Sequence, residues 1–197
     1  MVVLFEMSLG SLRSNLMIKK YNPNDKYENL YYVAKSLSAL HKCNLVHGDF
    51  HSGNLLLLYQ DMMWISDLGL SKPADKPNKT NEVYGVLPYI APEILLGNPY
   101  TKAADIYSFS IIMWEMTSGI PAFNKRPHDF GLALEICQGL RPEIIEGTMS
   151  EYADLMKKCW DEDPNKRPTA EELIKYFDKW QDKYKYTYIK RIPVPSK

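Results

Sequence analysis

The chain has 197 residues, of which 45% are hydrophobic, and it is long enough to bury one sizeable core. Its 24 Lys and Arg residues balance 24 Asp and Glu residues, so no net field favours binding to nucleic acid or to an anionic membrane. The three cysteines lack the spacing of a disulfide framework or a zinc site, and no apolar run resembles a membrane span or a signal peptide. These features predict a soluble cytoplasmic protein without a membrane segment.

The first half of the chain predicts two helices and a few short strands. A short buried strand is expected over Val2–Phe5, and a short helix is expected over Ser11–Leu16. Apolar residues then recur at helical spacing from Asp25 to about Lys42, the pattern of a long amphipathic helix. The apolar runs Leu55–Leu58 and Met63–Ile65 are predicted to pair as a hairpin.

The second half predicts helices almost throughout. The segment Lys72–Val83 is polar, contains proline and has no periodicity, so it is expected to form an exposed loop. A helix buried on most sides is predicted over Ala104–Met116, because that segment is apolar nearly all round. Three further helices are expected at about Phe130–Gln138, Ser150–Trp160 and Thr169–Tyr184. The predicted fold class is mainly α with a few short β-strands.

Three oxygen-bearing side chains stand beside apolar runs. Asp49 and Asn54 lie in the segment Val46–Asn54, and Asp67 lies in the segment Ser66–Gly69. Phosphoryl transfer needs a group that orients the attacking hydroxyl and oxygen ligands that hold Mg²⁺ against the phosphates. Two carboxylates and an amide at this spacing supply those parts.

In its motifs the chain resembles the large C-terminal lobe of a eukaryotic protein kinase. Residues 47–49 (His-Gly-Asp) resemble the family's catalytic-loop motif, residues 67–69 its Asp-Phe-Gly motif, and residues 91–93 its Ala-Pro-Glu motif. Asp105 resembles the buried helix carboxylate that braces the catalytic loop, and Arg167 resembles the partner of Glu93 in a buried ion pair. The segment around Cys159 and Arg167 is similar to the tyrosine-kinase-like group. The resemblance implies a kinase domain over residues 1–182 and a tail over residues 183–197.

The resemblance also implies roles for the motif residues. Asp49 would accept or orient the proton of the substrate hydroxyl, and Asn54 and Asp67 would hold Mg²⁺ while ATP donates its γ-phosphate. His51 stands where serine/threonine kinases usually carry a lysine that reaches the γ-phosphate, so it is the fourth predicted catalytic residue. A mostly neutral imidazole is a weaker phosphate ligand than an ammonium group.

The expected adenine contacts are mostly apolar or backbone. Leu4 would lie at the back of the adenine pocket, Glu6 and Met7 would belong to the hinge, and Leu56 would form the apolar floor. Together with Asp67, these are the predicted nucleotide-binding residues, and ATP and Mg²⁺ are the predicted cofactors. A protein is the predicted substrate.

Two departures from the family pattern bear on regulation and specificity. Gly48 replaces the arginine that in many relatives pairs with a phosphorylated activation loop, so we expect activity that does not depend on loop phosphorylation. The segment Gly85–Tyr89 resembles the serine/threonine pattern more than the tyrosine pattern, although Val86 lacks the usual threonine hydroxyl. We therefore expect Ser or Thr substrates, with Tyr as the less favoured choice.

The sequence contains no Gly-x-Gly-x-x-Gly motif and no strand lysine followed by a helix glutamate ahead of the hinge. The resemblance therefore predicts that the N-terminal small lobe is absent, and with it the phosphate-covering loop. We expect such a truncated chain to transfer phosphate weakly or not at all by itself, whereas a form extended upstream would be active.

Two other functions fit parts of the sequence. Small-molecule kinases of the aminoglycoside and choline type share the His-Gly-Asp pattern and the following asparagine, but they lack the counterparts of Glu93, Asp105 and Arg167. A kinase-like binding module without catalysis is the second alternative, and the retained Asp49, Asn54 and Asp67 argue against it. Among the remaining residues, His41 and His128 are expected to be solvated, and Trp114, Trp160 and Trp180 are expected to pack in the core.

Overall fold

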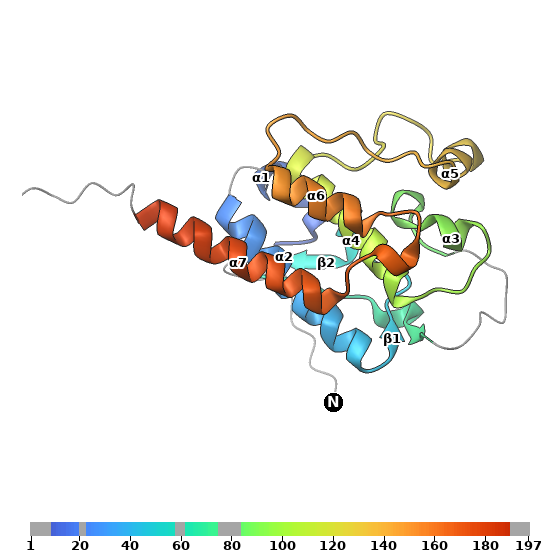
Figure 1. Cartoon of the computed structure of the whole chain (residues 1–197). Coiled ribbons are helices and arrows are strands. Elements are labelled where there is room, and N and C mark those ends of the chain that lie inside the picture. The colour runs from blue at the N-terminus through green and yellow to red at the C-terminus, as the bar shows by residue number, and fades with distance from the viewer. Residues whose placement is uncertain (1–8, 20–22, 58–61, 75–83, 190–197) are drawn as a thin grey trace, which may run out of the picture.

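The computed structural model describes residues 9–19, 23–57, 62–74 and 84–189 (Figure 1). The predicted strand over Val2–Phe5 lies outside these residues. The described helices are α1 (Leu12–Lys19), α2 (Pro23–Lys42), α3 (Pro92–Leu95), α4 (Lys102–Ser118), α5 (Phe130–Cys137), α6 (Ser150–Cys159) and α7 (Ala170–Ile189). The mainly helical fold class is therefore confirmed.

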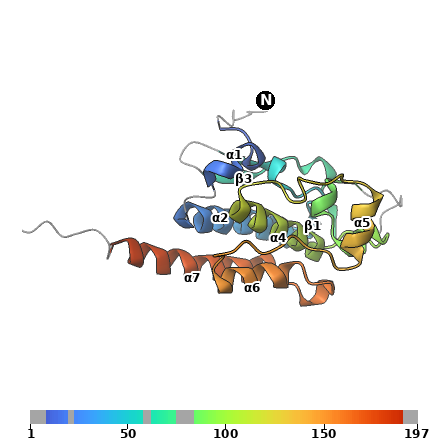
Figure 2. The same cartoon turned by 90° about the horizontal axis from the view of Figure 1, so that it is seen from above.

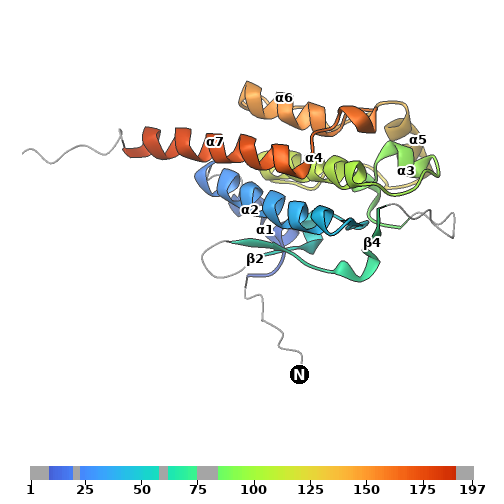
Figure 3. The same cartoon turned by 60° about the horizontal axis from the view of Figure 1, so that its bottom comes forward.

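The helices form layers around α4. Figure 2 shows α2 and α4 in the middle, with α6 and α7 on one side and α1 on the other. Nearly all side chains of α4 are buried, as its unbroken apolar sequence predicted. Helix α7 packs along α2, and α6 packs against α4 (Figures 1 and 3). The core thus lies between the C-terminal helices and the segments that carry the sequence motifs.

Aromatic rings connect the middle of this core to the segment that follows strand β1 (Leu45–Val46). Phe50 is buried and stacks on Phe109 of α4, with 6.2 Å between the ring centroids. Phe109 stacks in turn on Phe177 of α7 at 5.8 Å, and Phe177 meets Trp180 edge-on at 5.5 Å. Because close-packed cores tolerate little displacement, this row fixes the position of the residues beside Phe50.

In the described part of the chain, four short strands make two antiparallel pairs, which lie on the side of α2 that faces away from α7 (Figure 3). Strands β2 (Leu55–Leu57) and β3 (Met63–Ile65) pair as the predicted hairpin. Strands β1 (Leu45–Val46) and β4 (Lys72–Pro73) pair with Val46 opposite Lys72. The prediction of an exposed loop from Lys72 was therefore wrong for its first two residues, because a strand this short leaves no alternating pattern in the sequence. The rest of that loop, residues 75–83, lies outside the described part.

Helix α7 ends later than its sequence pattern predicted. It continues to Ile189 rather than to about Tyr184. Its last turns contain no glycine or proline, and the first helix-breaking residue after them is Pro193. The division between a domain ending at residue 182 and a following tail stays a prediction. Within the described residues, no helix combines the length and the apolar character needed to cross a bilayer.

Candidate active site

Asp105 of α4 holds the backbone of the loop that follows β1. Its carboxylate is buried and accepts hydrogen bonds from the amides of His47 at 2.9 Å and Gly48 at 3.2 Å. A third bond comes from the His41 ring, whose Nε2 lies 2.8 Å from Asp105 Oδ2. The prediction that His41 is solvated was wrong, because the fold brings it from the end of α2 onto a carboxylate distant in sequence. His128 is exposed, as expected.

His47 connects the two motif-bearing segments. Its ring is fully buried, with Nε2 donating to the Ser66 carbonyl at 3.0 Å. Its Nδ1 accepts from the backbone amide of Asp49 at 3.3 Å. Both ring nitrogens are thus occupied, and His47 has a structural role as the resemblance implied.

Asp49 and Asn54 interact directly. The Asn54 side-chain amide donates to the Asp49 carbonyl at 2.9 Å and to Asp49 Oδ2 at 3.2 Å. The other carboxylate oxygen, Oδ1, is buried and has no hydrogen-bond partner among the described residues. A short 3-10 turn, Ser52–Asn54, carries Asn54 back toward Asp49. One oxygen of Asp49 is therefore held by Asn54, and the acceptor capacity of the other is unused within the described residues.

The β2–β3 hairpin joins the residue before Asp67 to Asn54. The amide and the hydroxyl of Ser66 both donate to the Asn54 carbonyl, at 2.9 and 3.0 Å. Asp67 follows at once, with a left-handed backbone (φ 57°, ψ 68°), and its carboxylate accepts from the Gly69 amide at 3.3 Å. Non-glycine residues seldom adopt this conformation, and those that do gather at functional sites.

His51 lies against Asp49. Its Nδ1 accepts from the Gly53 amide at 3.0 Å, so the proton of the neutral ring is on Nε2, which lies 3.5 Å from Asp49 Oδ2. Burial lowers the pKa of His51 below 6.5, and the Arg13 guanidinium acts in the same direction, while Asp49 opposes both. The imidazole is therefore neutral at pH 7.

A second buried network, formed by Ser52, Tyr89 and Glu115, holds the short turn that follows Asp49 in the chain. The Tyr89 hydroxyl donates to Glu115 Oε1 at 2.6 Å and lies 2.8 Å from Ser52 Oγ. Glu115 also accepts from the Ala122 amide at 2.9 Å, and burial raises the pKa of its carboxyl group. The network links the turn of Asn54 to α4 through Tyr89.

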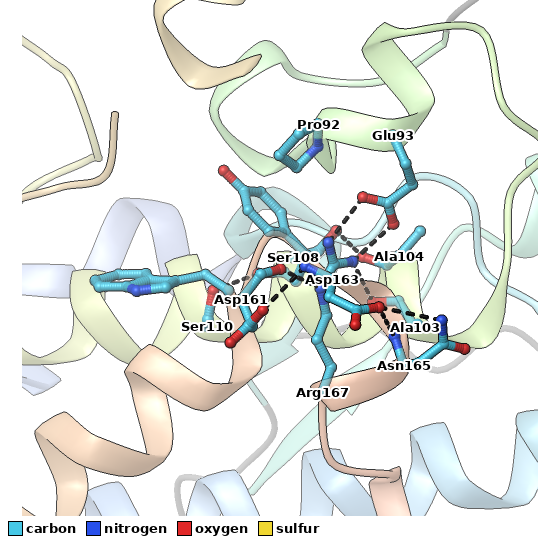
Figure 4. A network of polar contacts seen from close by, with 12 residues as sticks. Pro92, Glu93, Ala103, Ala104, Ser108, Ser110, Asp161, Asp163, Asn165 and Arg167 are labelled. Atoms are coloured by element: carbon cyan, nitrogen blue, oxygen red, sulfur yellow. Dashed lines mark hydrogen bonds and ion pairs between the residues drawn. The ribbon is translucent and has the colours of Figure 1, made fainter. Parts of the chain in front are cut away.

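Glu93 and Arg167 form a buried ion pair. Two parallel bonds of 2.7 Å join the guanidinium to the carboxylate, as the dashed lines in Figure 4 show. Arg167 also donates to the carbonyls of Asp161 at 2.9 Å and Ala103 at 3.0 Å. The pair thereby joins α3, which contains the proline and the glutamate of the Ala-Pro-Glu motif, to the start of α4 and to the turn before α7.

Comparison with known families gives a match to the model described as protein tyrosine and serine/threonine kinase, over residues 1–177. The chain belongs to the protein kinase family. This membership accounts for the order of the sequence motifs, and it decides against a small-molecule phosphotransferase.

Named relatives of this kinase chain are serine/threonine-protein kinases. A probable serine/threonine-protein kinase of Dictyostelium discoideum is 34% identical over 147 residues, which cover 75% of this chain and 11% of the relative. A second one from the same organism is 34% identical over 168 residues, 84% of this chain and 18% of the relative. The serine/threonine-protein kinase STY17 of Arabidopsis thaliana is 30% identical over 143 residues, 72% of this chain and 25% of the relative. The chain thus spans between a tenth and a quarter of the length of these relatives.

The kinase fold brings most of the described candidate residues together. Asp49, Asn54 and His51 contact one another, and Asp67 follows the residue bonded to Asn54. Leu56 is half-buried on β2. Leu4, Glu6 and Met7 lie outside the described residues, so their predicted nucleotide contacts stay predictions.

Sequence reasoning missed the residues that support this site from a distance. Ser52, Tyr89 and Glu115 are separated by tens of positions in the chain and share no spacing that indicates contact. Their burial also hides them, since a serine in a loop and a glutamate in a helix usually face solvent. Only Glu115 could have been recognised as buried from the sequence, because it stands among apolar residues in α4.

Proposed function

We propose that this chain contributes the large lobe of an enzyme that transfers the γ-phosphate of ATP to Ser or Thr hydroxyls of proteins. The main support is the paired contact of the Asn54 amide with Asp49, beside a hairpin in which Ser66 is bonded to Asn54 and Asp67 comes next. The Ser/Thr preference is supported by the names of the relatives and by the segment Gly85–Tyr89.

Asp49 is the proposed acceptor of the proton from the substrate hydroxyl. Its Oδ1 is buried and has no partner in the described part of the chain, whereas Oδ2 is held by Asn54. An acceptor fixed in this way orients the hydroxyl without first losing a hydrogen bond of its own. His47 cannot take this role, because both of its ring nitrogens are engaged.

Asn54 and Asp67 are the proposed Mg²⁺ ligands, and their chemistry fits the ion. The Asn54 amide nitrogen is committed to Asp49, so its side-chain oxygen is the atom left to bind a metal. The described residues contain no cluster of three or more His, Cys, Asp or Glu side chains that could hold a metal. One carboxylate and one amide suit Mg²⁺, which keeps waters and substrate phosphates among its ligands. When bound, the ion supplies positive charge against the phosphates.

The adenine base is proposed to lie on Leu56, with Leu4, Glu6 and Met7 completing its site. We also propose a cytoplasmic location, because Cys43, Cys137 and Cys159 are free thiols, as a reducing compartment favours.

Substitution of Asp67 by asparagine tests the proposed metal site. We expect Asp67→Asn to weaken Mg²⁺-dependent binding of ADP by at least about tenfold. Loss of one interaction with a charged group costs about 1.4 kcal/mol or more, which corresponds to this factor. Isothermal titration with and without Mg²⁺ measures this loss, and Asp178→Asn on the exposed face of α7 is the control. Equal Mg²⁺ dependence of ADP binding in the wild type and in Asp67→Asn would contradict the metal site.

The preference for Ser or Thr is checked separately, by phosphoamino-acid analysis of a substrate protein that the enzyme has phosphorylated.

A lysine in place of His51 should strengthen phosphate binding. His51 is neutral at pH 7 because burial lowers its pKa, whereas Lys carries a full charge. We expect His51→Lys to raise kcat/KM for ATP by about tenfold at pH 7.5, and the advantage should shrink as the pH falls through the lowered pKa, where the wild-type ring becomes charged. A pH series of kcat/KM for both proteins measures the effect. An advantage that is constant from pH 5.5 to 8 would show that the charge of His51 has no such role.

A further inference from the structure

We propose that Tyr100 is a positioning residue for Asp49: with Lys72 stacked on its ring, it holds residues Tyr84 and Gly85 against the Asp49 carboxylate without any phosphate group. We name Tyr100, Lys72 and Tyr84 the tyrosine clamp. The inference rests on the proposed function, because it concerns how the same site is kept in order.

The clamp consists of two contacts of one buried side chain. The Tyr100 hydroxyl donates to the Tyr84 carbonyl at 2.5 Å. The Lys72 ammonium lies 4.0 Å from the centroid of the Tyr100 ring, a cation–π distance. Tyr100 is only 6% exposed, so its ring has a fixed position immediately before α4. Burial raises the pKa of Tyr100 to about 12, so the hydroxyl remains a donor throughout the neutral pH range.

Gly85 carries the effect of the clamp to the site. It follows Tyr84 with φ +117°, a conformation that favours glycine, and a Cβ added to it would lie 3.4 Å from Asp49 Oδ1. Asp49, Gly85 and Tyr100 line one small cavity of about 10 Å³. Displacing Tyr84 would therefore move the backbone that encloses the unpartnered oxygen of Asp49.

Lys72 ties the clamp to the other side of the loop. It lies on β4 opposite Val46, the last residue of β1 before the catalytic loop. Its side chain passes over Gly48, since a Cβ added there would lie 3.9 Å from Lys72 Cε. The contacts thus run from β1 through Lys72 and Tyr100 to Tyr84, and the next residue, Gly85, lies beside Asp49.

Hydrogen exchange on the 197-residue chain tests the clamp without requiring catalysis. The amides of Tyr89 and Ile90 donate to the carbonyls of Val86 and Leu87, in the turn that follows Gly85. Tyr100→Phe removes only the hydroxyl, and Lys72→Met removes the charge but keeps the stem. We expect exchange of these two amides to become about fivefold faster in either variant, because each loses one stabilising contact.

The matched control is Tyr152→Phe. Tyr152 is also buried and donates to a backbone carbonyl, that of Met113, at 2.8 Å. The Tyr152→Phe variant should not accelerate exchange at Tyr89 and Ile90 relative to the amides of α4. Unchanged exchange in Tyr100→Phe, or equal acceleration in Tyr152→Phe, would overturn the proposal.

Kinetics separate the clamp from the proposed function. In active protein we expect Tyr100→Phe to lower kcat about fivefold with an unchanged KM for ATP, and phosphatase treatment to leave both kcat and exchange unaltered. A lower kcat that appears only after phosphatase treatment would contradict the clamp. If exchange changes as expected but the form extended upstream transfers no phosphate, the clamp stands and the proposed function fails.

Discussion

Asp49→Asn is expected to lower kcat for phosphoryl transfer by about 10³-fold, within the range that a positioned general base contributes. The amide keeps the size of the side chain and an oxygen for the Asn54 bond, but it cannot take up a proton. Since Asp49 is not a proposed metal ligand, Mg²⁺-dependent ADP binding should stay within about threefold of the wild type. Transfer of labelled γ-phosphate and nucleotide titration measure the two effects separately.

The fold of this variant is checked by its thermal unfolding, and Asp163→Asn serves as a control. Asp163 is a surface carboxylate that caps the turn Pro164–Lys166, far from Asp49 in the chain. Its loss should leave kcat unchanged. Full activity in Asp49→Asn would remove the catalytic role of Asp49, and a non-catalytic binding module would then be the better account.

Arg167→Met is expected to give the largest loss of stability. The guanidinium is fully buried and serves Glu93 and two carbonyls, so its removal leaves a nearly buried carboxylate without a partner. Breaking one side of a buried pair typically costs about 3–5 kcal/mol, which lowers Tm by about 10 °C in a chain of this size. Calorimetry or circular dichroism measures the shift.

Two further variants make this prediction specific. Arg126 and Glu135 form a similar two-point ion pair, but both side chains are largely solvated, so Arg126→Ala should leave Tm unchanged. Arg167→Met combined with Glu93→Met should recover part of the loss, because the unpaired carboxylate is gone. Equal Tm values for Arg167→Met and the wild type would contradict a stabilising role of the pair.

Long-period patterns and ordered motifs carried most of the correct predictions. Helix α2 was predictable because its apolar residues repeat over many turns, and α4 because its sequence is apolar nearly all round. The pairing of Glu93 with Arg167 was implied by the family resemblance, although the two residues are distant in the chain. Trp114, Trp160 and Trp180 are buried, as their size and apolar character predicted.

What the sequence concealed are single contacts between distant segments. His41 was expected in solvent because no partner stands near it in the chain, yet it meets Asp105. Tyr100 likewise meets partners distant in the chain, which lie on either side of residues 75–83. Such contacts depend on how helices and loops pack, and neither periodicity nor local spacing records them.

The most direct test of the account is paramagnetic broadening by Mn²⁺ in the presence of ADP. If Asn54 and Asp67 hold the divalent ion with the nucleotide, their amide NMR signals and those of neighbouring Gly53 and Ser66 should broaden first. The Asp67→Asn variant should abolish this broadening. If nucleotide-dependent broadening appears elsewhere in the chain while Asn54 and Asp67 stay sharp, the proposed metal and nucleotide site is contradicted.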